Sequence, residues 1–166
     1  MAEPSRTIAV LVANPALSSI LSMVLASVPS YRVRPFDSEL ALVTYMRLAP
    51  VDIVVTDFDS ASARADLVTR DLRADSAIPF REYQVIALAS EVSPETKNLC
   101  IASGIDEVIV KPMSPRYLVE RVRSRLARRG PTVRGDRDEG RPRPDFSQYG
   151  NVIPLWTRER PLPTTH

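Results

Sequence analysis

The sequence predicts a doubly wound α/β fold built on a five-stranded parallel sheet. Three observations lead to it: five short apolar runs rich in β-branched residues, helical hydrophobic spacing between the runs, and a proline or glycine at most of the junctions. Strands that alternate with helices through short connections favour a parallel sheet with helices on both faces. The five predicted strands cover residues 7–12, 31–36, 51–56, 83–89 and 105–110.

The first two predicted strands are each followed by a helix. Asn14-Pro15 breaks the run at 7–12, and a series of apolar residues with helical spacing comes next. This series is Leu17, Ile20, Leu21, Val24 and Leu25. In the strand at 31–36, arginine alternates with other residues and Pro35 is present, which indicates the edge of a sheet. Ser38 then predicts the N-cap of a short second helix.

The run at 51–56 is the most informative part of the sequence, because it is rich in β-branched, apolar residues and then stops at Asp57. Such a run is typical of a central parallel strand that is buried on both faces. Ligands and chemistry in open α/β sheets sit at the carboxyl ends of the strands. Asp57 is therefore the first candidate functional residue. Residues 58–80 are polar and predict a weaker third helix.

The remaining helices have strong end signals. Ser93-Pro94-Glu95 combines an N-cap, a proline in the first turn and an acid, and Gly104 predicts the end of that helix. Lys111-Pro112 ends the fifth strand, and Ser114-Pro115 begins the last helix. That helix has an apolar stripe, and its opposite face is expected to be polar. The residues assigned to the polar face are Arg116, Glu120, Arg121, Arg123, Arg125 and Arg128.

Composition limits the classes of function. The formal net charge is +2, which disfavours a nucleic-acid binder that depends on a basic surplus. Cys100 is the only cysteine and His166 the only histidine, so an internal disulfide and a histidine-based metal site are excluded. No apolar run reaches the length of a membrane span and no signal-peptide pattern opens the sequence, so we expect a cytoplasmic protein without membrane insertion.

The sequence divides into a domain at residues 6–128 and a tail at 129–166. Four of the five glycines and six of the 15 prolines fall at or after Gly130. Such a composition does not bury a core, so we expect the tail to be disordered until a ligand orders it.

The predicted domain resembles the CheY-like receiver domain of bacterial response regulators. The resemblance rests on the strand DIVVTD ending in Asp57, on Lys111-Pro112 after the fifth strand, and on the five-fold order of strand and helix. It implies a flavodoxin-like sheet with strand order 2-1-3-4-5. It also implies that Asp57 is the phospho-acceptor candidate and that Lys111 is its partner.

Other positions depart from the receiver pattern. The acidic pair that holds Mg²⁺ in the family is replaced by Val12-Ala13-Asn14, the hydroxyl residue after the fourth strand by Ala89, and the aromatic residue of the fifth strand by Val108. Mg²⁺ is therefore expected to bind weakly or not at all. We interpret Asp57 first as a structural carboxylate paired with Lys111. The alternative is a single-domain response regulator that a histidine kinase phosphorylates on Asp57.

The tail interleaves arginine with aspartate and glycine and contains the only tryptophan. Only two of the 22 basic residues are lysines, Lys97 and Lys111, so every cation of the tail is a guanidinium. Arginine can donate two hydrogen bonds to guanine, and arginine or tryptophan can stack on a base. A passive, solvated linker is the alternative.

The combination resembles the Cle proteins, CheY-like receivers with an arginine-rich extension that binds cyclic di-GMP. By this resemblance the protein is a non-enzymatic signalling module that binds cyclic di-GMP and then docks on a protein partner such as the flagellar motor switch. Nothing in the sequence indicates a catalytic nucleophile with its base, or a metal cluster. The candidate ligand-binding residues are Arg129, Arg134, Asp136, Arg137, Asp138, Arg141, Arg143, Asp145 and Trp156.

Overall fold

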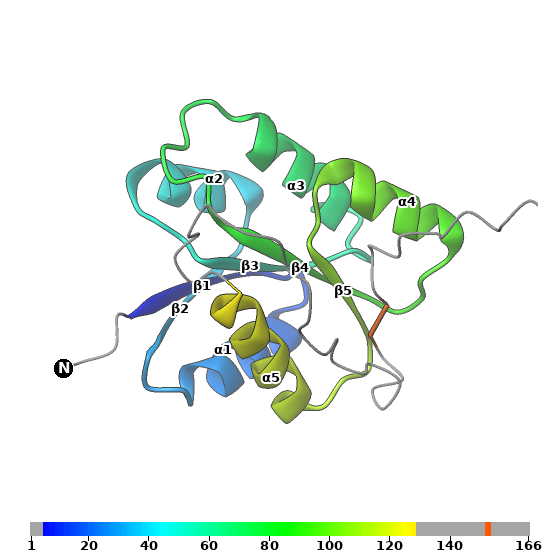
Figure 1. Ribbon diagram of the computed structural model, residues 1–166, viewed down its shortest axis with the longest axis horizontal. Coiled ribbons are helices and arrows are strands. Elements are labelled where there is room, and N and C mark those ends of the chain that lie inside the picture. Colours follow the sequence, from blue (N-terminus) through cyan, green and yellow to red (C-terminus); the bar gives the residue numbers. More distant parts are fainter. Residues whose placement is uncertain (1–4, 129–151, 154–166) are drawn as a thin grey trace, which may run out of the picture.

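A computed structural model describes residues 5–128 and the backbone of residues 152–153. Strands and helices alternate along residues 5–128, as the sequence predicts (Figure 1). The strands are β1 (Arg6–Leu11), β2 (Tyr31–Phe36), β3 (Ile53–Asp57), β4 (Gln84–Ala89), β5 (Glu107–Val110) and β6 (Val152–Ile153). The helices are α1 (Pro15–Ala26), α2 (Glu39–Leu48), α3 (Ala65–Ala74), α4 (Pro94–Ser103) and α5 (Pro115–Ala127).

The sheet has the order β2-β1-β3-β4-β5-β6. The first five strands pair in parallel, which confirms the predicted 2-1-3-4-5 order. β6 adds to the outer edge of β5 in the antiparallel direction. Sequence analysis did not predict β6, because a two-residue strand has no periodicity to detect.

Helices cover both faces of the sheet, with α1 and α5 on one side and α2, α3 and α4 on the other (Figure 1). Each face holds its own apolar core. Alternate residues of β3 divide between the two cores, so Ile53 and Val55 pack towards α1 and α5, whereas Val54 packs towards α2 and α3. All three side chains are fully buried. This explains why β3 is apolar at every position up to Thr56, and it fixes the end of the strand at Asp57.

The predicted helix caps are present. The side chains of Ser38, Ser93 and Ser114 accept hydrogen bonds from the backbone N–H three residues ahead. Each such cap stabilises its helix by about 1 kcal/mol. Gly104 ends α4 with a φ of 86°, a left-handed conformation that side-chain-bearing residues rarely adopt. These caps fix where the loops at the sheet ends begin.

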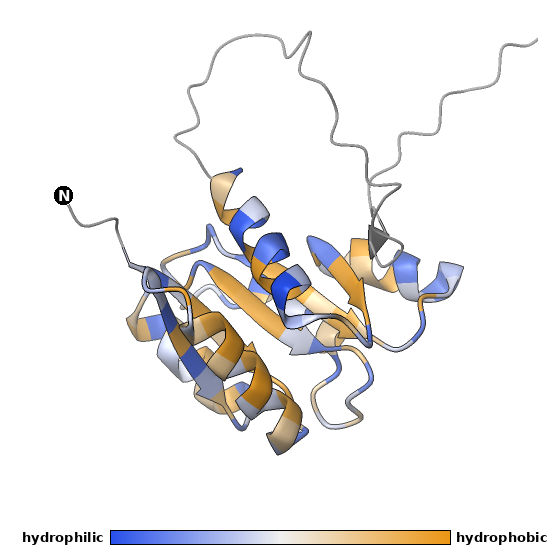
Figure 2. Ribbon diagram, turned by 90° about the horizontal axis from the view of Figure 1, so that it is seen from below, coloured by the Kyte–Doolittle hydropathy of each residue, from blue (hydrophilic) through white to orange (hydrophobic). Residues whose placement is uncertain are grey.

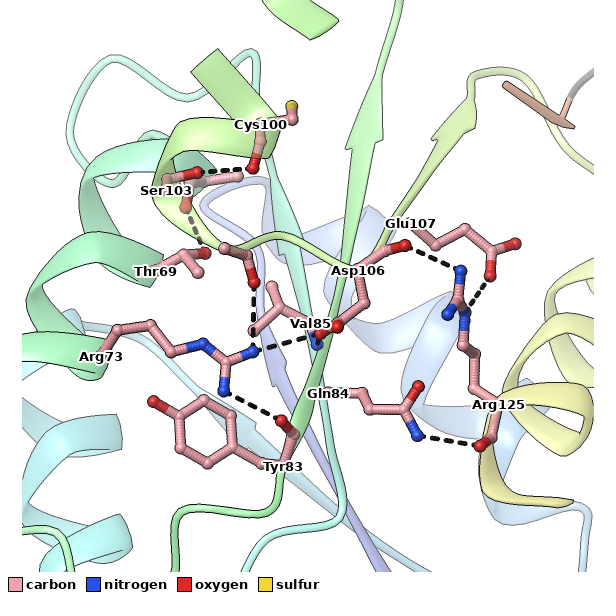
Figure 3. Close-up of polar contacts among 12 residues, drawn as sticks. Thr69, Arg73, Tyr83, Gln84, Val85, Cys100, Ser103, Asp106, Glu107 and Arg125 are labelled. Atoms are coloured by element: carbon pink, nitrogen blue, oxygen red, sulfur yellow. Dashed lines mark hydrogen bonds and ion pairs between the residues drawn. The ribbon is translucent and has the colours of Figure 1, made fainter. Parts of the chain in front are cut away.

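A buried cluster of charge fastens α5 to the start of β5. Glu107 is 2% exposed, and its two carboxylate oxygens accept hydrogen bonds from Arg121 and Arg125. Arg125 also donates to the backbone oxygen of Asp106 at 2.7 Å (Figure 3). Both arginines belong to the polar face that the sequence predicts, but they turn inward because they bind the acid of the neighbouring strand.

A second arginine, Arg73 of α3, completes the polar contacts at this end of β4 and β5. Its guanidinium donates to the backbone oxygens of Tyr83 and Gly104 and to the carboxylate of Asp106, each at 3.1–3.2 Å (Figure 3). It also lies over the ring of Tyr83, 4.4 Å from the centroid. The amino ends of β4 and β5 are thus held together by structural ion pairs and hydrogen bonds.

Figure 2 shows that hydrophobic residues predominate in α1, whereas α5 carries hydrophilic residues along its outer turns. None of the helices in the described part of the chain is long and apolar enough to cross a membrane.

Candidate functional site

The candidate site lies at the carboxyl ends of β3, β4 and β5. Asp57 is the last residue of β3 and is 7% exposed. The loop that follows is held to β4, since the backbone N–H of Phe58 donates to the carbonyl of Leu88 at 2.7 Å. Asp57 itself accepts a hydrogen bond from the backbone N–H of Asp59 at 2.9 Å. A carboxylate thus stands where the sequence predicted one.

Lys111 follows β5 and reaches across to this carboxylate. Its Nζ lies 3.1 Å from both Oδ1 and Oδ2 of Asp57. The same ammonium lies 2.8 Å from Oδ2 of Asp59. The peptide bond between Lys111 and Pro112 is cis. The predicted ion pair between Asp57 and Lys111 is therefore present, and a third residue shares it.

That third residue, Asp59, was missed by the sequence analysis. Its Oδ2 also accepts hydrogen bonds from Ser90, at 2.8 Å from the backbone nitrogen and 2.7 Å from the hydroxyl. Ser90 therefore binds Asp59 and not Asp57. The available signal was the spacing Asp57-Phe58-Asp59, which puts a second acid into the loop directly after a buried strand.

The pKa values at the site reflect this shared arrangement. Burial alone would raise the pKa of Asp59, but hydrogen bonds from Lys111 and Ser90 outweigh burial and hold the pKa below its ordinary value of 3.8. Burial likewise opposes the charge of Lys111, but hydrogen bonds to Asp59 and Asp57 raise the pKa of the ammonium above its ordinary 10.5. Asp59 and Lys111 are therefore both charged at neutral pH.

The end of β1 supplies no acid to this network. Val12 is 4% exposed, and Ala13 has no polar side-chain atom. Asn14 offers a carbonyl oxygen, but that oxygen accepts the backbone N–H of Leu17 at 3.1 Å as the N-cap of α1. Mg²⁺ requires carboxylate oxygens and tight octahedral geometry. The donor set therefore does not fit a magnesium ion at the position where receivers hold theirs.

Two other kinds of site can be assessed in the described residues: a metal site and a cysteine nucleophile. Among them, no group of three or more His, Cys, Asp and Glu side chains lies close enough to hold a metal ion. Cys100 is fully buried, and burial raises the pKa of its thiol to about 11. The thiol is therefore protonated and inaccessible, so it does not serve as a nucleophile.

A hollow of about 380 Å³ lies beside the shared lysine. Its lining residues are Leu17, Ser90, Lys111, Pro112 and Met113. The side chain of Lys111 is 20% exposed, and its ammonium is held by Asp57 and Asp59. The hollow therefore borders the lysine side chain next to the two aspartates.

The nine candidate ligand-binding residues of the tail lie outside the described residues. They are Arg129, Arg134, Asp136, Arg137, Asp138, Arg141, Arg143, Asp145 and Trp156. Their predicted role in binding cyclic di-GMP stays a prediction.

Solved structures that resemble this chain include receiver domains. The chemotaxis response regulator CheY4 of Vibrio cholerae matches with a TM-score of 0.64 and 20% identity, covering 74% of this chain and 99% of that one. A CheY-like receiver domain protein of Methanospirillum hungatei matches with a TM-score of 0.66 and 15% identity, covering 75% of this chain and 95% of that one. The chain has the receiver fold. At these identities the likeness establishes the receiver fold alone.

Relatives in sequence include response regulators. The DNA-binding response regulator MtrA of Mycolicibacterium smegmatis is 32% identical over 115 residues, which are 69% of this chain and 48% of the relative. MtrA of Mycolicibacterium paratuberculosis is 36% identical over 92 residues, 55% of this chain and 38% of the relative. No family model matches the chain. The chain spans about half the length of these relatives or less, so the match concerns the receiver fold and not the whole relative.

Proposed function

We propose that this protein is a signalling module that works by binding, with a receiver fold as its scaffold and the arginine-rich tail as the site of a guanine dinucleotide, cyclic di-GMP. The ligand-bound protein then docks on a protein partner, such as the flagellar motor switch. The observation that supports a non-enzymatic receiver scaffold is the network at the carboxyl ends of β3 and β5. In this network Asp57 and Asp59 share the ammonium of Lys111.

The end of β1 favours binding over metal-dependent phosphoryl transfer, because it carries Val12 and Ala13 in place of acids. Both oxygens of Asp57 are in contact with Lys111. Removal of the Lys111 ammonium would leave the carboxylate of Asp57, which is 7% exposed, without this cation. Such a loss lowers the free energy of unfolding. The ion pair therefore stabilises the loops at this edge of the sheet.

The residue types of the tail support cyclic di-GMP as the ligand. Each arginine that bonds guanine bidentately contributes about 1–3 kcal/mol, and each base stacked on an aromatic or guanidinium plane contributes a similar amount. Phosphate oxygens accept paired hydrogen bonds from further arginines. Coupled folding of the tail would cost roughly 2–5 kcal/mol. Several such contacts are enough to offset this cost.

Isothermal calorimetry on the intact protein tests the proposal. We expect cyclic di-GMP to bind the wild type and to lose at least about tenfold in affinity in the variant Arg134→Ala/Arg137→Ala/Arg141→Ala, because each lost guanine or phosphate contact is worth about 1–3 kcal/mol. Arg116→Ala is the matched control, since Arg116 is an exposed arginine of α5 outside the tail. No heat with the wild type, or equal losses in the two variants, would defeat the nucleotide proposal.

A second function is supported by one feature of the site: Asp57 and Lys111 occupy the positions of the receiver phospho-acceptor and its lysine, beside an open hollow. In this alternative, a histidine kinase phosphorylates Asp57 and the tail is passive. Incubation with acetyl phosphate and Mg²⁺, followed by intact-mass measurement, separates the two. A phosphoryl adduct on the wild type that is absent from Asp57→Asn would support phosphorylation, and an unmodified wild type would support a purely structural ion pair.

A further inference from the structure

The two edges of the parallel sheet differ in how they protect their free backbone groups. At the β2 edge, Arg32, Arg34 and Pro35 are exposed. Charged side chains and a proline discourage the addition of a further strand, because proline has no N–H to donate and charges resist burial. The β2 edge is thus built to stay unpaired.

The β5 edge has no such protection. Its sequence is Glu-Val-Ile-Val, and Val108 and Ile109 are fully buried. The single charge of the strand, Glu107, is taken up by Arg121 and Arg125 of α5 and is 2% exposed. An edge strand with apolar side chains and no outward charge leaves its free N–H and C=O groups open to pairing with another extended segment.

The chain itself supplies that segment. In β6, Ile153 pairs with Val108 and Val152 pairs with Ile109, both in antiparallel register (Figure 1). The next residue in the sequence is Pro154, which cannot donate a ladder hydrogen bond. Backbone hydrogen bonds contribute about 0.5–1.5 kcal/mol net each, so a two-residue ladder is weak enough to be displaced.

We propose that the outer edge of β5 is a strand-docking site that the chain fills with its own segment Val152–Ile153, as a displaceable latch. When the latch is released, the edge accepts an extended, β-branched segment of a partner protein by β-strand addition. Main-chain hydrogen bonds supply the affinity in this mode of recognition. The proposal goes beyond the proposed function, because it requires neither nucleotide binding nor phosphorylation.

Covalent connection explains how so short a strand can hold the site. Residues 129–151 link β6 to the end of α5, so pairing is intramolecular and the local concentration of a tethered segment reaches the millimolar range. A free peptide of the same sequence must compete with that concentration. An intact latch therefore lowers the apparent affinity of any partner strand for β5.

Amide hydrogen exchange on the full chain tests whether β6 protects β5. The variant Val152→Pro/Ile153→Pro removes both N–H groups of the latch, and Thr164→Pro places a proline elsewhere in the same tail as the control. Adjacent amides of a strand point to opposite edges, so only the β5 amides that face β6 report on the latch. We expect exchange at these amides to accelerate by about tenfold or more in the latch variant and to stay unchanged in the control. Equal exchange in wild type and latch variant would overturn the proposal.

A fluorescent peptide of residues 149–155 tests whether the released edge is a docking site. We expect it to bind the latch variant at least about tenfold more tightly than the wild type, since the tethered competitor is gone. Equal affinity for both proteins, or no binding to the latch variant, would overturn the docking site. Protection of β5 in the wild type that rises with protein concentration, together with a dimer in sedimentation, would overturn the intramolecular latch in favour of strand exchange between two copies.

Discussion

Two clusters of charge lie at opposite ends of β5 and differ in the balance of their ions. At the amino end, one carboxylate, Glu107, is held by two guanidinium groups and is almost fully buried. At the carboxyl end, one ammonium, Lys111, serves two carboxylates, and the side chain of Asp59 is 37% exposed. The first cluster is a buried structural joint, whereas the second is a partly exposed network.

The largest effect is expected at the amino end. Glu107→Ala leaves Arg121, which is 8% exposed, without its carboxylate. Removing one partner of a buried ion pair costs about 3–5 kcal/mol. We expect a decrease of this size in the free energy of unfolding, measured by urea denaturation with circular dichroism. A loss below about 1 kcal/mol would show that the cluster behaves as an exposed ion pair and would remove the contrast between the ends.

A smaller effect is expected at the carboxyl end. Lys111→Met removes the ammonium from Asp57 and Asp59, and hydrogen bonds to charged groups contribute about 1.5–3 kcal/mol. We expect Lys111→Met to lower the free energy of unfolding by about 2 kcal/mol. We expect the double variant Lys111→Met/Asp57→Asn to recover part of this loss. A double-mutant cycle measures the recovery. Additive losses would show that the two side chains are not coupled.

The cluster at the carboxyl end of β5 should make the free energy of unfolding depend on pH. The pKa of Asp59 is lower in the folded protein than its ordinary value of 3.8, so its contribution is present above that value and is lost as pH falls through the folded pKa. The pKa of Lys111 is raised, so its contribution is present below 10.5 and is lost as pH rises through the raised value. Compared with the wild type, Asp59→Asn should lose less stability between neutral pH and acid. Parallel acid profiles in denaturant titrations would contradict this.

The smallest effect is expected from an ion pair that belongs to neither cluster. Arg116 and Glu120 pair along α5 at 3.1 Å, with side chains 88% and 42% exposed. Exposed pairs of this spacing contribute about 0.3–0.5 kcal/mol. Glu120→Ala should therefore change the free energy of unfolding by no more than this, in the same urea assay as Glu107→Ala. If Glu120→Ala lowered the free energy of unfolding as much as Glu107→Ala does, removal of any acid near α5 would destabilise the protein. Burial of the acid would then not determine the size of the effect.

The strands and the helix ends could be predicted because their signals are local. The apolar run before Asp57 marks a strand buried on both faces, and Ser38, Ser93 and Ser114 each cap a helix as expected. The pair of Asp57 and Lys111 was also predictable, because parallel strands end at the same edge of the sheet. Asp59 and its bonds to Ser90 were not, because the direction of a loop side chain depends on contacts that sequence spacing does not encode.

The sequence by itself determined the alternation of strand and helix, the absence of acids at the end of β1, and the arginine-rich composition after α5. Only the tertiary structure decided which charges meet. It turned Arg121 and Arg125 inward to Glu107, shared Lys111 between two aspartates, and brought Val152–Ile153 to the edge of β5. The physical reason is the sequence separation over which each kind of interaction acts. Hydrophobic periodicity and capping act within a few residues, whereas ion pairs and sheet edges join segments that only folding brings together.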